Sequence, residues 1–196
     1  AGDGRLTFAK PERENCDGYA YDPENPSQHI IDMSENEIEV PEDYTREELR
    51  QDLLCYTSPV LKEDLVLTGD MTAELYISSD APDTDFVVRV TDVDENGRSI
   101  KLADGLLSAR YRNGFAQSEF LQEGEIVCLK IRTTKLSNCF RKGHRIRVTV
   151  TSSAKNFIFP NSNTREGFAS ARTVVAHNRV YHGGLHASRL TVRVEP

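Results

Sequence analysis

Apolar and polar residues alternate with a period of two over several segments of this chain. A strand buried on one face has this period, whereas an amphipathic helix repeats about every 3.6 residues. The pattern therefore predicts an all-β protein. The apolar members of the alternating sets are Met71/Ala73/Leu75/Ile77, Phe86/Val88/Val90, Val127/Leu129/Ile131, Ile146/Val148/Val150 and Leu190/Val192/Val194.

Turn signals separate these segments. The clearest is Asn96-Gly97, which predicts a tight hairpin with positive φ at both residues and antiparallel strands on either side. Shorter apolar runs at 157–159 and 173–176 raise the expected number of strands to at least seven. Many short strands with almost no helical period indicate a β-sandwich or barrel, and the absence of a fixed repeat argues against a propeller or solenoid.

The first 43 residues have a different character, because four prolines and many turn-forming residues interrupt any period. We expect residues 1–52 to form an extended arm with one short helical turn, and residues 53–196 to form the sandwich. In the helical turn, Thr45 is predicted to be the N-cap of a capping box completed by Glu48. The apolar side chains expected to dock the arm individually are Leu6, Phe8, Tyr19, Tyr21, Ile30 and Ile31.

Composition excludes some classes of partner and location. A formal net charge of −7 over 196 residues disfavours binding to nucleic acid, which requires clustered cations. No apolar run approaches the roughly 20 residues that span a bilayer, so no membrane partner is expected. The polar start of the chain does not resemble a signal peptide, and the spacing of the four cysteines fits neither a zinc site nor a disulfide scaffold. Reduced thiols and a cytoplasmic location are therefore expected.

The sequence carries no catalytic constellation that we recognise. It has no G-x-S-x-G motif, and Ser58, Ser78 and Ser79 lie at strand ends and turns rather than on a nucleophile elbow. His182 and His186 are four residues apart, but the Gly-Gly between them favours a turn over a metal-binding helix. No catalytic residue, metal ligand or cofactor is assigned. A calcium site in the acidic segment 80–85 is the weaker alternative to turn-forming aspartates.

Several segments, taken in order, resemble the C-terminal domain shared by X-prolyl dipeptidyl-peptidases, cocaine esterase, α-amino-acid ester hydrolases and related acylases. The resemblance covers nearly the whole chain, and it depends on the order and spacing of the segments more than on any one of them. The segments are Gly2–Leu6, Tyr19–Pro23, Tyr56–Val60, Ser78–Phe86, Asp92–Arg98, Asp104–Arg112 and Tyr181–Leu190.

The resemblance implies a jelly-roll β-sandwich of the galactose-binding-like type. It also implies that the catalytic Ser, Asp and His belong to an α/β-hydrolase domain that precedes this segment, so none is transferred to this chain. The implied role is to buttress that domain and its active-site entrance, with a homo-oligomer as a further possibility. Candidate contact residues are Asp80, Asp83, Asp85, Phe86, Phe157 and Phe159, and the alternative function is a carbohydrate-binding jelly-roll module.

Overall fold

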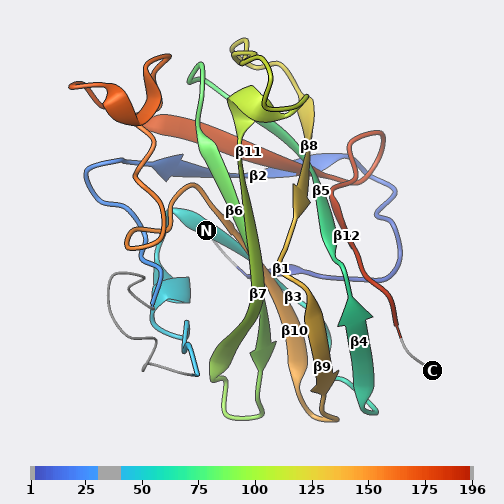
Figure 1. Cartoon of the computed structure of the whole chain (residues 1–196). Coiled ribbons are helices and arrows are strands. Elements are labelled where there is room, and N and C mark those ends of the chain that lie inside the picture. The colour runs from blue at the N-terminus through green and yellow to red at the C-terminus, as the bar shows by residue number, and fades with distance from the viewer. Residues whose placement is uncertain (1–2, 31–40, 195–196) are drawn as a thin grey trace.

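The computed structural model describes residues 3–30 and 41–194, and two five-stranded β-sheets packed face to face make up most of it (Figure 1). The first sheet has the order β1 (Asp3–Arg5), β3 (Leu53–Thr57), β10 (Arg145–Thr151), β6 (Asp85–Val93), β7 (Ser99–Ser108). The second has β5 (Thr72–Ser79) at its centre, with β8 (Val127–Arg132) on one side and β12 (Arg189–Thr191), β11 (Ala176–His182) and then β2 (Asn15–Tyr21) on the other. A small third sheet pairs β4 (Leu65–Gly69) with β9 (Leu136–Phe140).

The core forms where the alternating apolar sets of the two sheets meet. Leu75 and Ile77 from β5 and Phe86 and Val88 from β6 are each at most 5% exposed and belong to one cluster that spans both sheets. One-face burial is the reason for the period of two, because successive side chains of a strand point to opposite faces. The predicted all-β sandwich is confirmed.

The two sheets touch closely at one edge. There the chain that leaves β8 runs against β7: Thr134 N–H donates to the carbonyl of Asp104 at 2.7 Å, and Asp104 N–H donates to Thr134 Oγ1 at 3.2 Å. A Cβ atom on Gly105 would collide with the carbonyl oxygen of Arg132. This edge is therefore closed by backbone against backbone.

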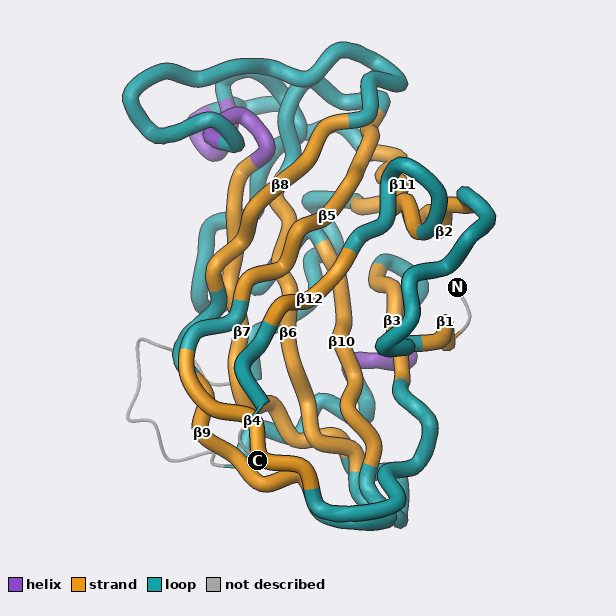
Figure 2. Tube along the Cα trace, turned by 90° about the vertical axis from the view of Figure 1, so that its right-hand side faces the viewer, coloured by secondary structure: helices purple, strands orange, loops and turns teal. Residues whose placement is uncertain are grey.

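At the opposite edge the segment between β1 and β2 passes from the first sheet to the second (Figure 2). β1 pairs in parallel with β3, whereas the other strand pairs of the described residues are antiparallel. The segment expected to be an arm thus contributes two strands. β2 lies at the end of the second sheet beside β11.

The apolar residues of that segment differ in how far they are buried. Tyr19 and Tyr21 of β2 are buried, and Tyr19 Oη lies 2.7 Å from Ser152 Oγ, but Phe8 is 91% exposed. The prediction that Phe8 docks is therefore wrong. Ile31 lies outside the described residues. The anchoring of this segment comes mainly from ladder hydrogen bonds and two buried tyrosines.

The hairpin between β6 and β7 is antiparallel as predicted, but its turn is of a different type. Only Gly97 has positive φ, at +83°, so the prediction for Asn96 is wrong. Asp94 explains the difference: its carbonyl accepts from Gly97 N–H, and its carboxylate accepts from the N–H groups of Asn96 and Arg98. These bonds fit a turn with right-handed central residues followed by one left-handed glycine, the usual three-residue hairpin loop.

The capping box predicted at Thr45 and Glu48 is also wrong. The turn is a short 3-10 helix, η1 (Glu47–Leu49), and no side chain caps it. Thr45 Oγ1 donates to Asp43 instead, and the Glu48 carboxylate accepts from Arg147 at 2.6 Å and from Ser99 Oγ at 2.8 Å. For a carboxylate near a buried sheet face, a charge-assisted hydrogen bond from a guanidinium is stronger than one from a backbone N–H of its own turn.

Two predicted apolar runs are not strands. Residues 157–159 form a turn and loop, and residues 173–175 lead into β11, which begins at Ala176. Two further short 3-10 helices are η2 (Ala109–Tyr111) and η3 (Gly167–Ala169). Among the described residues there is no helix with the length and apolar character needed to cross a membrane.

Candidate functional site

The serines considered as nucleophiles all have structural partners. Ser58 Oγ donates to the carbonyl of Pro59 at 2.9 Å and accepts from Ile146 N–H at 3.0 Å. Ser79 Oγ accepts from Ala81 N–H, and Ser78 Oγ lies 3.0 Å from Tyr181 Oη. None of these hydroxyls is hydrogen-bonded to an imidazole, so none has the base that serine catalysis needs.

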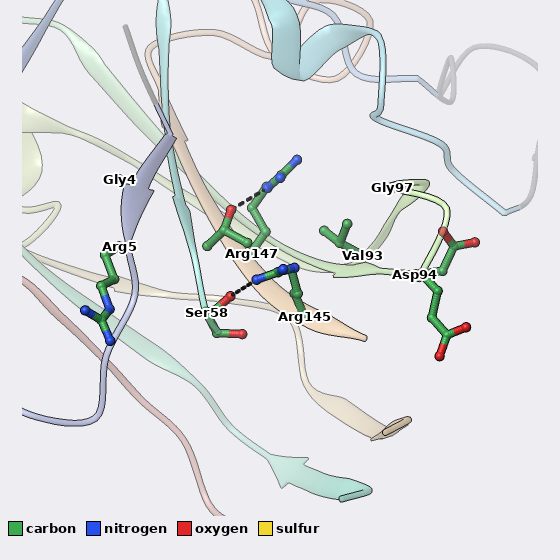
Figure 3. Close-up of a pocket in the computed structure, with 10 residues that line it drawn as sticks. Gly4, Arg5, Ser58, Val93, Asp94, Gly97, Arg145 and Arg147 are labelled. Carbon is green, nitrogen blue, oxygen red and sulfur yellow. Dashed lines mark hydrogen bonds between the residues drawn. The ribbon is translucent and has the colours of Figure 1, made fainter. Parts of the chain in front are cut away.

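Ser58 also lines a polar crevice of about 450 Å³ beside the β6–β7 hairpin (Figure 3). Two arginines there hold the end of β3: Arg145 Nη1 donates to the carbonyl of Ser58 at 3.1 Å, and Arg147 Nε donates to Thr57 Oγ1 at 2.7 Å. The opposing acid, Asp94, is occupied by its own turn. Arg145, Arg147 and Asp94 are therefore engaged by the strand ends and the turn that line the crevice.

The two histidines near the C-terminus flank a turn, as expected, and do not share a ligand site. Gly183 and Gly184 both have positive φ between β11 and β12. His182 Nε2 lies 3.2 Å from a carboxylate oxygen of Asp17, and His186 Nδ1 lies 3.1 Å from one of Glu14. Within residues 3–30 and 41–194 no group of three or more His, Cys, Asp and Glu side chains is arranged to hold a metal ion.

Asp80, Asp83, Asp85 and Phe159, four of the predicted contact residues, lie at one end of the sandwich, where loops from three parts of the chain meet. Asp83 is fully buried and accepts from Arg110 Nε at 2.8 Å, from Arg110 N–H at 2.9 Å and from Asn161 Nδ2 at 2.7 Å. Asn161 Nδ2 also donates to Asp85 at 2.9 Å. Burial, reinforced by the charge of Asp83, raises the pKa of Asp85 even though Asn161 and Ser108 hydrogen-bond to it.

Arg110 joins this acid to the third loop. Its Nη1 donates to the carbonyl of Arg165 at 3.1 Å and its Nη2 to the carbonyl of Thr164 at 3.0 Å. The planar guanidinium suits this role because it offers several donors in fixed directions. The three loops are therefore held as one rigid unit by Asp83, Arg110 and Asn161.

The remaining contact candidates have contrasting positions. Phe86 is fully buried in the core, so it supports the loops from inside and presents no surface to another domain. Asp80 is exposed and accepts from His177 Nδ1 and N–H, each at 2.7 Å. Partial burial of Asp80 opposes ionisation, but these two hydrogen bonds prevail and lower the pKa of its carboxyl.

Exposed aromatic rings cover the same end of the molecule. Phe159 is 80% exposed and stacks on Phe168, which is 77% exposed, with 6.0 Å between ring centroids. Nearby, the guanidinium groups of Arg110 and Arg165 lie over the half-buried ring of Phe120 at 5.1 and 4.5 Å. Phe115, on the loop that follows η2, is 80% exposed. We call Phe115, Phe120, Phe159 and Phe168 the aromatic end.

Phe157 lies apart from this group, since it is 43% exposed and its ring stacks on His29 at 4.9 Å. Sequence reasoning missed Phe168 and Arg110, whereas Asn161 lies in the segment 156–161 that was considered for the same contact. The acidic segment could have pointed to Arg110, because a buried aspartate needs a cationic partner. Arg110 lies in Asp104–Arg112, another of the segments that carry the family resemblance. Nothing in the local pattern around Phe168 marks it as exposed.

The fold and these loops define a β-sandwich module with a rigid, aromatic loop end. The chain belongs to the family described as the X-Pro dipeptidyl-peptidase C-terminal non-catalytic domain, whose model matches residues 2–191. The match covers nearly all of the described residues, and it assigns the chain to a domain family that is non-catalytic by description.

Individual relatives agree with this assignment. The chain is 34% identical to cocaine esterase of Rhodococcus sp. (strain MB1 Bresler) over an alignment of 200 positions, which covers 98% of this chain and 34% of that protein. Its structure is similar to an aminopeptidase from a marine sediment archaeon (Thaumarchaeota), with a TM-score of 0.89, 25% identity and coverage of 100% and 36% of the two chains. An α-amino acid ester hydrolase shares the fold, with a TM-score of 0.91, 23% identity and coverage of 98% and 35%. The chain thus spans about a third of the length of these proteins.

Proposed function

We propose that this module packs through its aromatic end onto an α/β-hydrolase domain that precedes it in the polypeptide, and that it buttresses the entrance to that domain's active site. The hydrolase would use a catalytic serine to cleave ester or amide bonds. The observation that carries the proposal is the stacked pair Phe159 and Phe168, each more than three-quarters exposed on a rigid loop end. Large exposed apolar patches of this kind mark interaction sites.

Rigidity supports the same conclusion. The loops that carry the rings are tied together by the buried Asp83 and by Arg110, so little conformational entropy is lost when the rings are covered. Arg165 and Arg110, stacked on Phe120, add planar cations that are common at protein interfaces. A surface that only closed the end of the sandwich would bury its phenylalanines rather than display them.

A cytoplasmic location is part of this proposal. Cys16, Cys55, Cys128 and Cys139 form no disulfide bond with one another in the structure, and Cys139 is exposed. Free thiols persist in reducing compartments.

The double substitution Phe159→Ser with Phe168→Ser tests the contact. In the polypeptide that includes the hydrolase domain, we expect it to weaken the domain interface by about 3 kcal/mol, since burying one large side chain contributes roughly 1.5–3 kcal/mol. Hydrogen exchange should show the loss as faster exchange of 109–120 and 156–170 in the double variant than in the wild type. Leu185→Ser is the matched control, because Leu185 is 85% exposed on the turn between β11 and β12.

The same double substitution in the 196-residue chain alone should change its unfolding free energy by no more than about 0.5 kcal/mol, because both rings are exposed there. This second measurement separates an effect on the domain interface from an effect on the folding of the chain. Equal exchange rates in the double variant and the Leu185→Ser control would contradict the proposal. Retention of the wild-type chain on a polysaccharide column, lost in the double variant, would favour the carbohydrate-binding alternative instead.

A further inference from the structure

A second, larger cavity lies at the edge of the sandwich that the segment between β1 and β2 crosses. Its volume is about 670 Å³. Residues 6–11 and 187–190 line its outer part, and Ala73 and Leu75 of β5 with Val148 and Val150 of β10, each at most 7% exposed, lie at its floor. We call it the edge cavity.

The edge cavity is too large to be a packing defect. It is open to solvent on one side, and its volume lies within the about 300–1,000 Å³ of small-molecule sites. Its floor is aliphatic and comes from both sheets, so an apolar ligand in it would extend the core at this edge. The opposite edge needs no such filling, because Gly105 lets the backbones of β7 and the β8–β9 connection meet.

Charge at the mouth selects the kind of ligand. The cavity's only carboxylate, Asp17, is already engaged, because it accepts from Tyr56 Oη at 3.0 Å and lies 3.2 Å from His182 Nε2. Of the cations, Arg189 pairs with Glu74. Arg5 and Lys10 have no ion-pair partner among the described residues, and both side chains line the mouth.

We propose that the edge cavity binds an amphipathic carboxylate, with its alkyl or aryl body between the two sheets and its carboxylate at Arg5 and Lys10. The occupant follows from complementarity: the apolar walls exclude a sugar or a free inorganic anion, and two unpaired cations favour one negative head group. The proposal does not depend on the domain contact at the aromatic end, which lies on other loops.

The test uses octanoate as probe and 1-octanol as its uncharged match, each titrated into the 196-residue chain and followed by methyl resonances in NMR. We expect saturable shifts for octanoate at Leu75, Val148 and Val150. Arg5→Ala with Lys10→Ala should weaken octanoate binding about tenfold, because a hydrogen bond to a charged group is lost, and should leave octanol binding unchanged. Lys135→Ala, which removes an exposed cation outside the cavity, is the matched control.

A second variant tests the cavity itself. Ala187 lines the mouth on the loop before β12, so Ala187→Phe should fill the space and abolish binding of both probes while the thermal midpoint stays within a few degrees of wild type. Three results would overturn the proposal: octanoate shifts that do not saturate, shifts confined to the aromatic end, or equal weakening by Lys135→Ala and by the Arg5/Lys10 double variant. If Ala187→Phe does not fold, the Arg5/Lys10 comparison between octanoate and octanol decides alone.

Discussion

Asp83→Ala is expected to lower the free energy of unfolding by about 3–5 kcal/mol, the cost of removing one partner from a buried ion pair. The side chain of Asp83 is fully buried, and it accepts from Arg110 twice and from Asn161 once. Without the Asp83 carboxylate, the Arg110 guanidinium is a largely buried charge with no acid to pair with, and it no longer links the loop of Asp83 to the other loops. Chemical denaturation of the 196-residue chain measures the loss.

Asp80→Ala provides the matched control in the same loop. Asp80 pairs with His177 at the surface, where both side chains are exposed by more than a third, and such pairs contribute at most about 1 kcal/mol. If Asp83→Ala costs no more than Asp80→Ala, the buried network does not hold the loop end, and the argument for a rigid aromatic end fails with it.

The second large effect is expected at the closed edge of the sandwich. Gly105→Ala should lower the free energy of unfolding by about 1–3 kcal/mol, the usual cost of overpacking, because the new methyl group meets backbone atoms of Arg132 and Thr133 that have no room to move. Gly105→Val should be worse. Both variants would push β7 away from the chain that follows β8.

Gly18→Ala is the comparison for this prediction, because Gly18 is also a strand glycine, in β2, and its added Cβ would be 3.4 Å from the nearest atom, the carbonyl oxygen of Asn178. We expect a change within about 0.5 kcal/mol, or a small gain from reduced freedom of the unfolded chain. Equal losses at Gly18 and Gly105 would mean that the effect comes from strand glycines in general and not from the close approach of the two sheets.

The sequence predicted the centre of the sandwich well and its margins poorly. β5, β6 and β10 were visible because each has at least three alternating residues that one-face burial makes apolar. β2 was not, because only Tyr19 and Tyr21 alternate in it and Gly18 has no side chain to contribute. Its place in the sheet depends on ladder bonds to β11, a partner more than 150 residues away.

Local sequence pattern also failed to predict which side chains are exposed at the aromatic end. Phe86 and Phe159 were equivalent candidates in the sequence, yet one is fully buried and the other 80% exposed, since burial depends on tertiary packing that a local pattern does not contain. The prediction of positive φ at Asn96 was wrong for a related reason. The Asp94 carboxylate accepts hydrogen bonds from the N–H groups of Asn96 and Arg98, and these bonds favour a different hairpin loop. Family resemblance supplied the expectation that a hydrolase domain carries the catalytic residues.

The most direct test of the central claim is to locate the reactive serine. The polypeptide that contains this chain together with its hydrolase domain is treated with a fluorophosphonate, digested, and analysed by mass spectrometry. We expect a single modified serine in the part that precedes residue 1 of the numbering used here, and no labelling or aryl-ester turnover by the 196-residue chain alone. An adduct on Ser58, Ser78, Ser79 or any other serine of this chain, with matching loss of activity, would contradict the account.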